Sequence, residues 1–347
     1  MRRRWGNRFL LCACAVCLVL GGCADKADTQ EDIEAAVQSE INIGLSFDSF
    51  VIERWMRERD VFVSRAKELG AEVNVQNANG DVEEQISQIE YFIKKQMDVI
   101  VVVAGDYQAL TDVMVKAREA GIKTICYDRL IQDAGCDLYV SFDNVEVGRL
   151  MAGSMAGCLP EGGTIFLIQG SPGDNNVKLV RQGIDEVLAG SGLKVAYEAD
   201  CDGWLAEYAY TYVKEGLKNN RDVKGIICGN DDLASQAFRA LSEERLAGQV
   251  YLTGQDGDLA ACQRIVEGTQ EMTAFKSIEE EARVAAECAV GLGGGEELED
   301  IGKTIHDGSY DVPYLELEPI AVTKENMDEV IINGGFHAKE DVYLNVK

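Results

Sequence analysis

The chain has 347 residues and carries 60 acidic against 33 basic side chains, so its net charge at pH 7 is −27. A surface of this sign repels phosphate backbones and anionic lipid headgroups, which argues against nucleic acids as partners and against peripheral docking on a membrane. A neutral or cationic small molecule is the kind of ligand that such a surface accommodates most easily.

The first 23 residues have the features of a secretion signal. Four arginines lie within the first eight residues, an apolar run spans residues 9–20, and Leu20-Gly21-Gly22-Cys23 closes the segment. The run is shorter than the roughly 20 apolar residues that a bilayer span needs, so we expect a signal peptide. The closing residues resemble a bacterial lipoprotein cleavage site, which implies that Cys23 is lipidated. The alternative is an ordinary signal peptide that ends in cysteine.

Residues 24–40 are polar and acidic, and we expect them to form a tether that is helical or disordered. Removal of the leader takes away four positive charges and changes the net charge from −27 to −31. The tether therefore holds a strongly acidic folded part away from the membrane.

The chain has eleven cysteines, a number that suggests disulfides until their positions in the sequence are considered. Three leave with the leader and Cys23 carries the anchor, so seven remain. These seven are scattered, with no C-x-x-C pair and no histidine neighbour that would predict a metal site. We expect them to be small buried residues, with one bridge left open as an alternative. They are Cys126, Cys136, Cys158, Cys201, Cys228, Cys262 and Cys288.

Beyond residue 40, short β-branched runs alternate with longer amphipathic segments. The expected strands are 41–47, 72–76, 99–103, 123–127, 164–168, 194–197, 225–228 and 250–253. Helices are expected at 53–69 and 83–96, where apolar residues recur every three or four positions. The alternation predicts an α/β fold with parallel sheets flanked by helices, and the length predicts two domains with a first boundary between residues 121 and 144.

Polar residues follow several of these strands. In open α/β sheets, ligands bind beyond the carboxyl ends of the strands, so we expect these residues to converge. Each loop is expected to start a helix, and helix capping is therefore the alternative role of any single Asp or Asn. The loops are Tyr127-Asp128-Arg129, residues 170–176 with Asp174 and Asn176, Gly229-Asn230-Asp231 and Gly254-Gln255-Asp256.

Convergent carboxylates, amides and guanidinium groups suit a sugar. Each sugar hydroxyl is both donor and acceptor, and hydrogen bonds to charged groups contribute roughly 1.5 to 3 kcal/mol each. A sugar also has an apolar face of C–H groups, for which Trp204, after a strand, and Trp55, at a helix start, are candidate platforms. The alternative for either tryptophan is simple packing.

With these residues in view, the chain is similar to the bacterial D-xylose-binding proteins, which belong to the type I sugar-binding family that serves ABC transporters. The likeness runs from about Ile41 to His337 and rests on the order and spacing of many short motifs. They are Ile52-Glu53-Arg54-Trp55, Gln76-Asn77-Ala78-Asn79-Gly80, Tyr127-Asp128-Arg129, Ser141-Phe142-Asp143-Asn144, Gly170-Ser171-Pro172, Asp174-Asn175-Asn176, Asp202-Gly203-Trp204, Gly229-Asn230-Asp231, Gly254-Gln255-Asp256 and Gly268-Thr269-Gln270.

The resemblance implies a two-lobed periplasmic-binding-protein fold joined by three crossing segments. One lobe is expected from residues 41–143 and 278–314, and the other from 144–277 and 315–347. The ligand-binding residues that the resemblance implies are Arg54, Asp128 and Arg129 on the first lobe and Asp174, Asn176, Asn230, Asp256 and Lys276 on the second, with Trp204 stacked on the sugar ring. Gly173 stands where a larger residue is expected, which predicts a looser loop around Asp174.

Together with the anchor expected at Cys23, the resemblance implies an extracytoplasmic, monomeric receptor that closes around a monosaccharide, D-xylose first, and delivers it to an ABC permease. No cofactor, metal or nucleic acid is expected. One alternative keeps sugar binding but signals to a membrane histidine kinase, and nothing in the residues separates the two outputs.

Two other protein classes fit the residues less well. A glycoside-active enzyme would use Asp128, Asp174 and Asp256 as acid and base, but the chain has no nucleophile elbow, phosphate-binding glycine loop or metal motif. A transcription regulator of the same two-lobed fold would need a DNA-binding module, where this chain has a signal peptide and a large negative charge.

Overall fold

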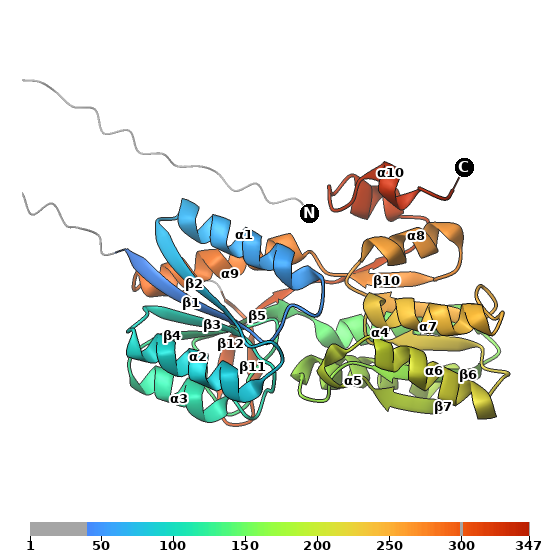
Figure 1. Ribbon diagram of the computed structural model, residues 1–347, viewed down its shortest axis with the longest axis horizontal. Coiled ribbons are helices and arrows are strands. Elements are labelled where there is room, and N and C mark those ends of the chain that lie inside the picture. The colour runs from blue at the N-terminus through green and yellow to red at the C-terminus, as the bar shows by residue number, and fades with distance from the viewer. Residues whose placement is uncertain (1–39, 299–300, 347) are drawn as a thin grey trace, which may run out of the picture. The chain divides into compact units, whose positions relative to one another are not determined.

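The computed structural model describes residues 40–298 and 301–346, which form two sheets with helices on both faces of each (Figure 1). The predicted α/β architecture is confirmed. We call the region around the first sheet the first lobe, residues 40–143 and 278–317, and the region around the second sheet the second lobe, residues 144–277 and 318–346.

The first sheet has the strand order β11-β12-β5-β4-β3-β1-β2. Its pairs are parallel except that β11 runs antiparallel to β12, so one edge departs from the expected all-parallel arrangement. All five residues of β3 are buried, as expected for a strand that helices cover on both sides. The strands are β1 Ile41–Phe47, β2 Ala71–Asn77, β3 Val99–Val103, β4 Lys123–Tyr127, β5 Leu138–Phe142, β11 Thr304–His306 and β12 Asp311–Leu317.

The second sheet has the order β13-β10-β9-β8-β6-β7, and only its edge strand β13 is antiparallel among the strands described. The strands are β6 Gly163–Gln169, β7 Leu193–Asp200, β8 Gly225–Cys228, β9 Tyr251–Gln255, β10 Met272–Phe275 and β13 Ile320–Val322.

Helices α1 and α9 pack side by side on one face of the first sheet, while α2 and α3 cover the other. In the second lobe α4 and α5 pack so closely that a Cβ atom on Gly148 would lie 2.0 Å from the Val180 carbonyl oxygen, so the contact requires glycine. The helices are α1 Arg54–Glu68, α2 Val82–Lys94, α3 Thr111–Glu119, α4 Asn144–Cys158, α5 Asn175–Ser191, α6 Glu207–Asn219, α7 Asp231–Glu243, α8 Leu259–Glu267, α9 Ile278–Gly293 and α10 Lys339–Val342, with short turns η1 Asp202–Trp204 and η2 Asp328–Ile332.

The chain passes between the two sheets three times, after β5, after β10 and after β12. The third passage corrects the expected boundary at residue 314, because Leu315, Glu316 and Leu317 still pair with β5 in the first sheet. Three crossings place the carboxyl ends of both sets of parallel strands at the same junction, where ligands bind in α/β folds.

The predicted leader, the lipidation site Cys23 and the tether up to residue 39 lie outside the described residues. In the part that is described, no helix combines the length and the apolar character of a membrane span. The seven cysteines from Cys126 onward are free thiols in the structure.

Candidate functional site

A cavity between the two lobes is lined by all nine of the predicted ligand-binding residues. Protein atoms leave about 290 Å³ unfilled among these side chains, and part of this space is open to solvent. Three further residues, Ile52, Trp55 and Gln255, complete the lining. The nine are Arg54, Asp128, Arg129, Asp174, Asn176, Trp204, Asn230, Asp256 and Lys276.

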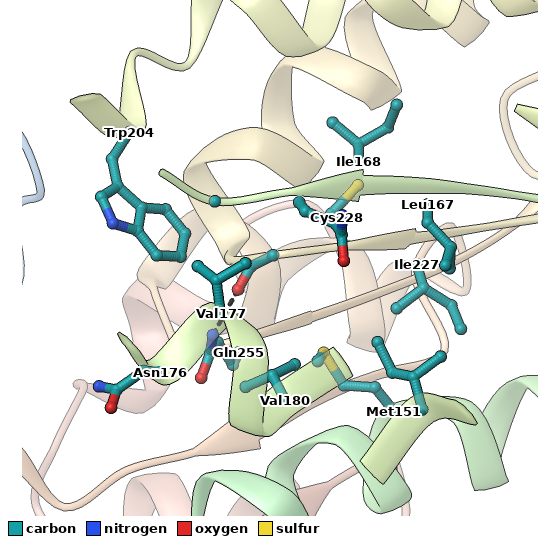
Figure 2. A pocket seen from close by; sticks show the side chains of 14 residues that line it. Met151, Leu167, Ile168, Asn176, Val177, Val180, Trp204, Ile227, Cys228 and Gln255 are labelled. Carbon is teal, nitrogen blue, oxygen red and sulfur yellow. Dashed lines mark hydrogen bonds between the residues drawn. The ribbon is translucent and has the colours of Figure 1, made fainter. Parts of the chain in front are cut away.

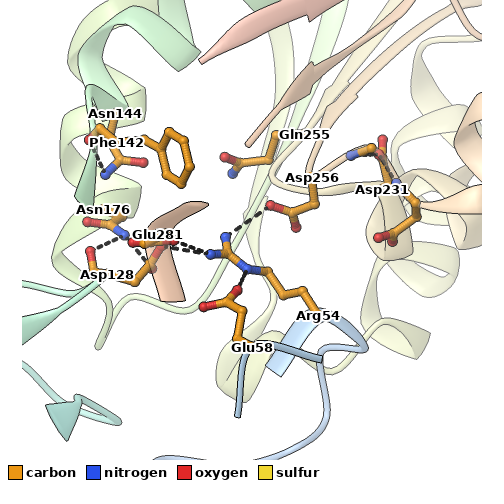
Figure 3. Close-up of polar contacts among 12 residues, drawn as sticks. Arg54, Glu58, Asp128, Phe142, Asn144, Asn176, Asp231, Gln255, Asp256 and Glu281 are labelled. Atoms are coloured by element: carbon orange, nitrogen blue, oxygen red, sulfur yellow. Dashed lines mark hydrogen bonds and ion pairs between the residues drawn. The ribbon is translucent and has the colours of Figure 1, made fainter. Parts of the chain in front are cut away.

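Arg54, at the first turn of α1, lies at the centre of a buried cluster of carboxylates (Figure 3). Its Nε donates to Glu58, one helical turn away, and its Nη2 lies 2.7 Å from Glu281 on α9. The same guanidinium is 3.3 Å from Asp128 and 3.4 Å from Asp256. Because Asp256 belongs to the second lobe, Arg54 connects the two lobes directly.

Burial and charge act against each other in this cluster. Burial would lower the pKa of Arg54, but the carboxylates of Glu58, Asp128 and Glu281 outweigh it and raise that pKa well above its usual value. Burial raises the pKa of Glu58 to about 7 and raises the pKa of Glu281 well above its usual value, although Arg54 opposes both shifts. The structure therefore keeps Arg54 charged while part of the surrounding carboxyl set is protonated near neutral pH.

The loop after β4 presents Asp128 and Arg129. Asp128 has a left-handed backbone conformation with φ of 60°, and its N–H donates to the Val140 carbonyl at 2.8 Å. Burial would raise the pKa of Asp128, but the positive charges of Arg54, Lys276 and Arg129 prevail and lower it. The Asp128 carboxyl is thus held as an anion at the cavity wall.

Arg129 is 2 % exposed and connects the first lobe to the second. Its Nη1 lies 2.7 Å from Asp48 and donates to the Ala104 carbonyl at 2.9 Å, while its Nε lies 2.8 Å from Asp174. Burial would lower the pKa of Arg129, but Asp174, Asp48 and Asp128 outweigh it and raise that pKa. Arg129 therefore stays charged without solvent.

Asp174 combines capping with a place in the site. Its Oδ1 accepts from the Asn176 N–H at 2.8 Å as the N-cap of α5, and its Oδ2 accepts from the indole N–H of Trp204 at 3.2 Å. The amide of Asn176 donates to the Asp128 carboxylate at 2.9 Å, which adds another contact between the lobes. Burial raises the pKa of Asp174, and Arg129 opposes the rise.

Asn230 and Asp256 stand at the ends of neighbouring strands of the second sheet. Asn230 caps α7 by accepting from the Leu233 N–H at 2.9 Å. Asp256 caps no helix, has φ of 100°, and leads into the loop before α8, and its N–H donates to the Ala274 carbonyl at 3.0 Å. Asp231 accepts from the Gly257 N–H at 3.0 Å and from the Thr273 hydroxyl at 2.7 Å. These bonds connect the start of the loop after Asp256 to strand β10.

Several buried polar atoms of the lining residues have no hydrogen-bond partner in the described part of the chain. The acceptors are Asp128 Oδ2 and Gln255 Oε1, and the donors are Asn230 Nδ2, Trp55 Nε1 and Arg129 Nε, the last of which forms an ion pair with Asp174. Asp128 Oδ2 lies near Arg54, but without the alignment of a hydrogen bond. Buried polar groups are ordinarily partnered, so these five atoms indicate a ligand that both donates and accepts.

A second, apolar pocket of about 370 Å³ adjoins the polar cavity (Figure 2). Val177, Val180 and Ile227 are among its walls, and it shares Trp204, Asn176 and Gln255 with the polar cavity. A Cβ atom on Gly170 would lie 2.1 Å from the Trp204 ring, so a glycine here lets the indole lie against the strand end. Trp204 therefore presents an apolar face and a bonded N–H at the boundary of the two pockets.

The structure corrects several expectations about individual residues. Neither Asp128 nor Asp256 caps a helix. The loop after Asp128 leads to strand β5, and the residue at the N-cap of α8 is Asp258. Lys276, which the resemblance implies as a ligand-binding residue, is 3 % exposed. The loop that was expected to be loose is tied across the lobes, because the Gly173 carbonyl accepts from the Tyr107 N–H at 3.0 Å.

Sequence reasoning missed the residues that support the lining. Glu58 stands four positions after Arg54 on one helix, a spacing that predicts an ion pair and was available from the sequence. Glu281 is 227 positions away from Arg54 and carries no local signal. Gln255 stands within the motif Gly254-Gln255-Asp256, but the resemblance implied only Asp256 as a ligand-binding residue.

The family description "Periplasmic binding protein domain" matches residues 43–297. The chain belongs to this family. Two similar proteins are the D-xylose-binding periplasmic proteins of Haemophilus influenzae, 45 % identical over 89 % of this chain and 94 % of the relative, and of Escherichia coli (strain K12), 43 % identical over the same shares. The family consists of sugar-binding transport receptors and not of enzymes, and it implies an extracytoplasmic location.

A solved structure supports the same assignment. The ABC transporter solute binding protein from Clostridium phytofermentans, crystallised with bound β-D-glucose, has a TM-score of 0.78 and 25 % identity. The match covers 87 % of this chain and 99 % of the other. The fold is therefore that of a solute-binding protein of this family.

Proposed function

We propose that the chain captures a monosaccharide, D-xylose before other sugars, between its two lobes and delivers it to an ABC permease. The observation that carries this proposal is the set of buried donors and acceptors without partners around one cavity. A pentose matches that set because each hydroxyl donates and accepts. The two relatives named as D-xylose-binding support the choice of sugar.

Each part of the lining has a proposed role. The charged and amide groups bind the hydroxyls, and Trp204 stacks its apolar face on the C–H face of the ring. The hydroxyl-binding groups are Arg54, Asp128, Arg129, Asp174, Asn176, Asn230, Asp256 and Lys276. None of them acts as a catalyst in this proposal.

The sugar favours a closed arrangement because both lobes contribute to the cavity. A ligand shifts a conformational equilibrium only by its different affinity for the two states, and a sugar held from both sides binds the closed state better. The pairs Arg54–Asp256 and Arg129–Asp174 already join the lobes, so the sugar adds to existing contacts. The permease then recognises the closed form.

We further propose that Cys23 carries a lipid anchor and that residues 24–40 connect this anchor to a monomeric receptor. The apolar run and the closing Leu20-Gly21-Gly22-Cys23 motif support this part of the proposal. Metabolic labelling of the cells with a fatty-acid analogue tests it, with Cys23→Ser as the unlabelled control.

Thermal unfolding of residues 24–347, scanned against xylose, glucose, ribose and arabinose, tests the sugar assignment. At about 100 times its dissociation constant a ligand stabilises the folded state by about 2.7 kcal/mol. This corresponds to a rise of several degrees in Tm. We expect the largest rise with xylose, and no rise with any of the four sugars would contradict the proposal.

A further inference from the structure

Two buried cysteine thiols face each other beneath the loop that supplies Asp128 and Arg129. The Sγ atoms of Cys126, in β4, and Cys136, just before β5, are 3.2 Å apart. Cys126 is 0 % and Cys136 3 % exposed. A disulfide needs about 2.05 Å between the sulfurs, so a shift of about 1 Å would allow bond formation.

The two cysteines stand at the two ends of that loop. At its base, the Asp137 N–H donates to the Thr124 carbonyl at 2.9 Å and the Asp137 carboxylate accepts from the Thr124 N–H at 2.9 Å. Within the loop, the Ile131 N–H points to the Cys126 sulfur at 3.5 Å. The two ends of the loop are therefore already held side by side without a covalent bond.

The backbone of the loop between β4 and β5 has features that a covalent bond at its ends would stabilise. It has left-handed backbone at Asp128, Asp133 and Gly135, with φ of 60°, 54° and 59°, and no helix or strand lies within it. Non-glycine residues in this conformation are strained, and the surrounding structure must hold them there. A covalent closure would limit the alternatives open to the unfolded chain.

We propose that Cys126 and Cys136 form a disulfide in the exported protein and that this bond fixes the loop carrying Asp128 and Arg129. In the reaction, the two thiols lose two protons and two electrons and one S–S bond forms. The oxidant is the disulfide of a thiol–disulfide exchange partner outside the cytoplasm, which accepts the two electrons and two protons and becomes a dithiol.

The burial of the pair indicates when the bond forms. The hydrogen-bonded contact with the Cys126 sulfur, together with burial, raises the pKa of Cys136 well above its usual value, and the thiolate is the reactive form of cysteine. The folded, reduced chain should therefore be oxidised slowly, while the bond forms readily during folding. Once formed, it is shielded from reductants.

Differential alkylation of the mature chain, taken from the envelope of the cells that produce it, tests the proposal. Free thiols are blocked in denaturant with light iodoacetamide, the chain is reduced, and the released thiols are labelled with heavy iodoacetamide. We expect the heavy label on Cys126 and Cys136 and the light label on Cys158, Cys201, Cys228, Cys262 and Cys288. Light label on Cys126 and Cys136, in this sample and after refolding with oxidised and reduced glutathione, would overturn the proposal.

The second measurement compares the unfolding of the oxidised chain with that of a chain reduced in denaturant and refolded in the presence of reductant. Reduction should lower the Tm of the wild-type chain by about 5 °C and leave that of a Cys126→Ser/Cys136→Ser variant unchanged. Cys262→Ser, which also replaces a buried thiol, is the control and should keep the wild-type response. An equal response to reductant in the wild type and the double variant would contradict the bond. Neither measurement uses a sugar, so the result is independent of the proposed ligand.

Discussion

The two lobes build their walls of the cavity in different ways. On the first lobe, Arg54 and Arg129 are held by other charged side chains, including Glu58, Glu281 and Asp48. On the second lobe, Asp174 and Asn230 are helix N-caps, and one oxygen of each accepts from a backbone N–H. The first wall depends on ion pairs between distant elements, while the second depends on local backbone geometry.

Because of this difference, substitutions on the two walls should affect folding stability and sugar binding differently. Removing one ion from a buried network leaves the other charges uncompensated, so a change on the first wall should affect folding and binding together. A change on the second wall that preserves the capping atom should affect binding alone. The following variants test this difference.

The largest effect is expected for Arg54→Ala. The variant loses its contacts to Asp128 and Asp256 and leaves buried carboxylates without their cation, so it should bind no measurable sugar and lose about 3 to 5 kcal/mol of stability. Calorimetric titration and urea unfolding measure the two effects. Arg59→Ala, on the same helix but only partly buried, is the control, and unchanged sugar affinity in Arg54→Ala would contradict the site.

The pH dependence of folding tests the first wall next. The pKa of Glu58 is raised from 4.5 to about 7, so the folded state binds this proton more tightly than the unfolded state. The resulting stabilisation is complete below about pH 4.5 and is lost as the pH rises to about 7, with an upper limit of about 3 kcal/mol.

Urea unfolding between pH 4.5 and pH 8 measures this loss. Glu58→Gln should show a flatter profile, since the glutamine has no proton to lose. Glu68→Gln, at an exposed position of the same helix, serves as the matched control. Profiles of equal slope in the wild type and Glu58→Gln would show that Glu58 does not contribute.

A smaller effect on binding alone is expected for Asn230→Ser. Serine keeps an oxygen for the Leu233 N–H but removes Nδ2, the donor without a partner. Sugar affinity should fall about tenfold, while the stability without sugar changes by less than about 1 kcal/mol. An unaltered affinity in this variant would remove Asn230 from the binding set, and an equal loss of stability would erase the distinction between the walls.

The smallest effect is expected for Trp204→Phe. The phenyl ring keeps an apolar face but loses the N–H that Asp174 accepts, so sugar affinity should fall about threefold. Trp204→Ala removes the ring as well and should weaken binding further. Equal affinities of the two variants would argue against stacking.

Local patterns in the sequence predicted much of the fold and, with the family resemblance, the site lining. The eight expected strands are present, because β-branched runs between amphipathic segments mark parallel strands. Strand β5 was missed because no helix separates it from β4, and β12 because Pro313 and charged residues interrupt its apolar pattern. The edge strands β11 and β13 have three residues each, too few to show a period.

The supporting residues were harder to predict for a physical reason. Glu281 reaches Arg54 only after the chain has crossed to the second lobe and returned, and Asp48 meets Arg129 only when strands far apart in the sequence have paired. Helix caps, by contrast, contact residues only a few positions away. The local sequence therefore allowed capping to be predicted for Asp174 and Asn230, as the alternative to ligand binding. In the structure, Asp174 caps α5 with Oδ1 and accepts from the Trp204 indole with Oδ2.

A crystal structure of the mature chain with D-xylose tests the central claim most directly. We predict one sugar in the cavity between the lobes, with hydroxyls bonded to Asn230 Nδ2 and Asp128 Oδ2 and with Trp204 against the ring. A sugar bound elsewhere, or inside the cavity without contact to these atoms, would contradict the account.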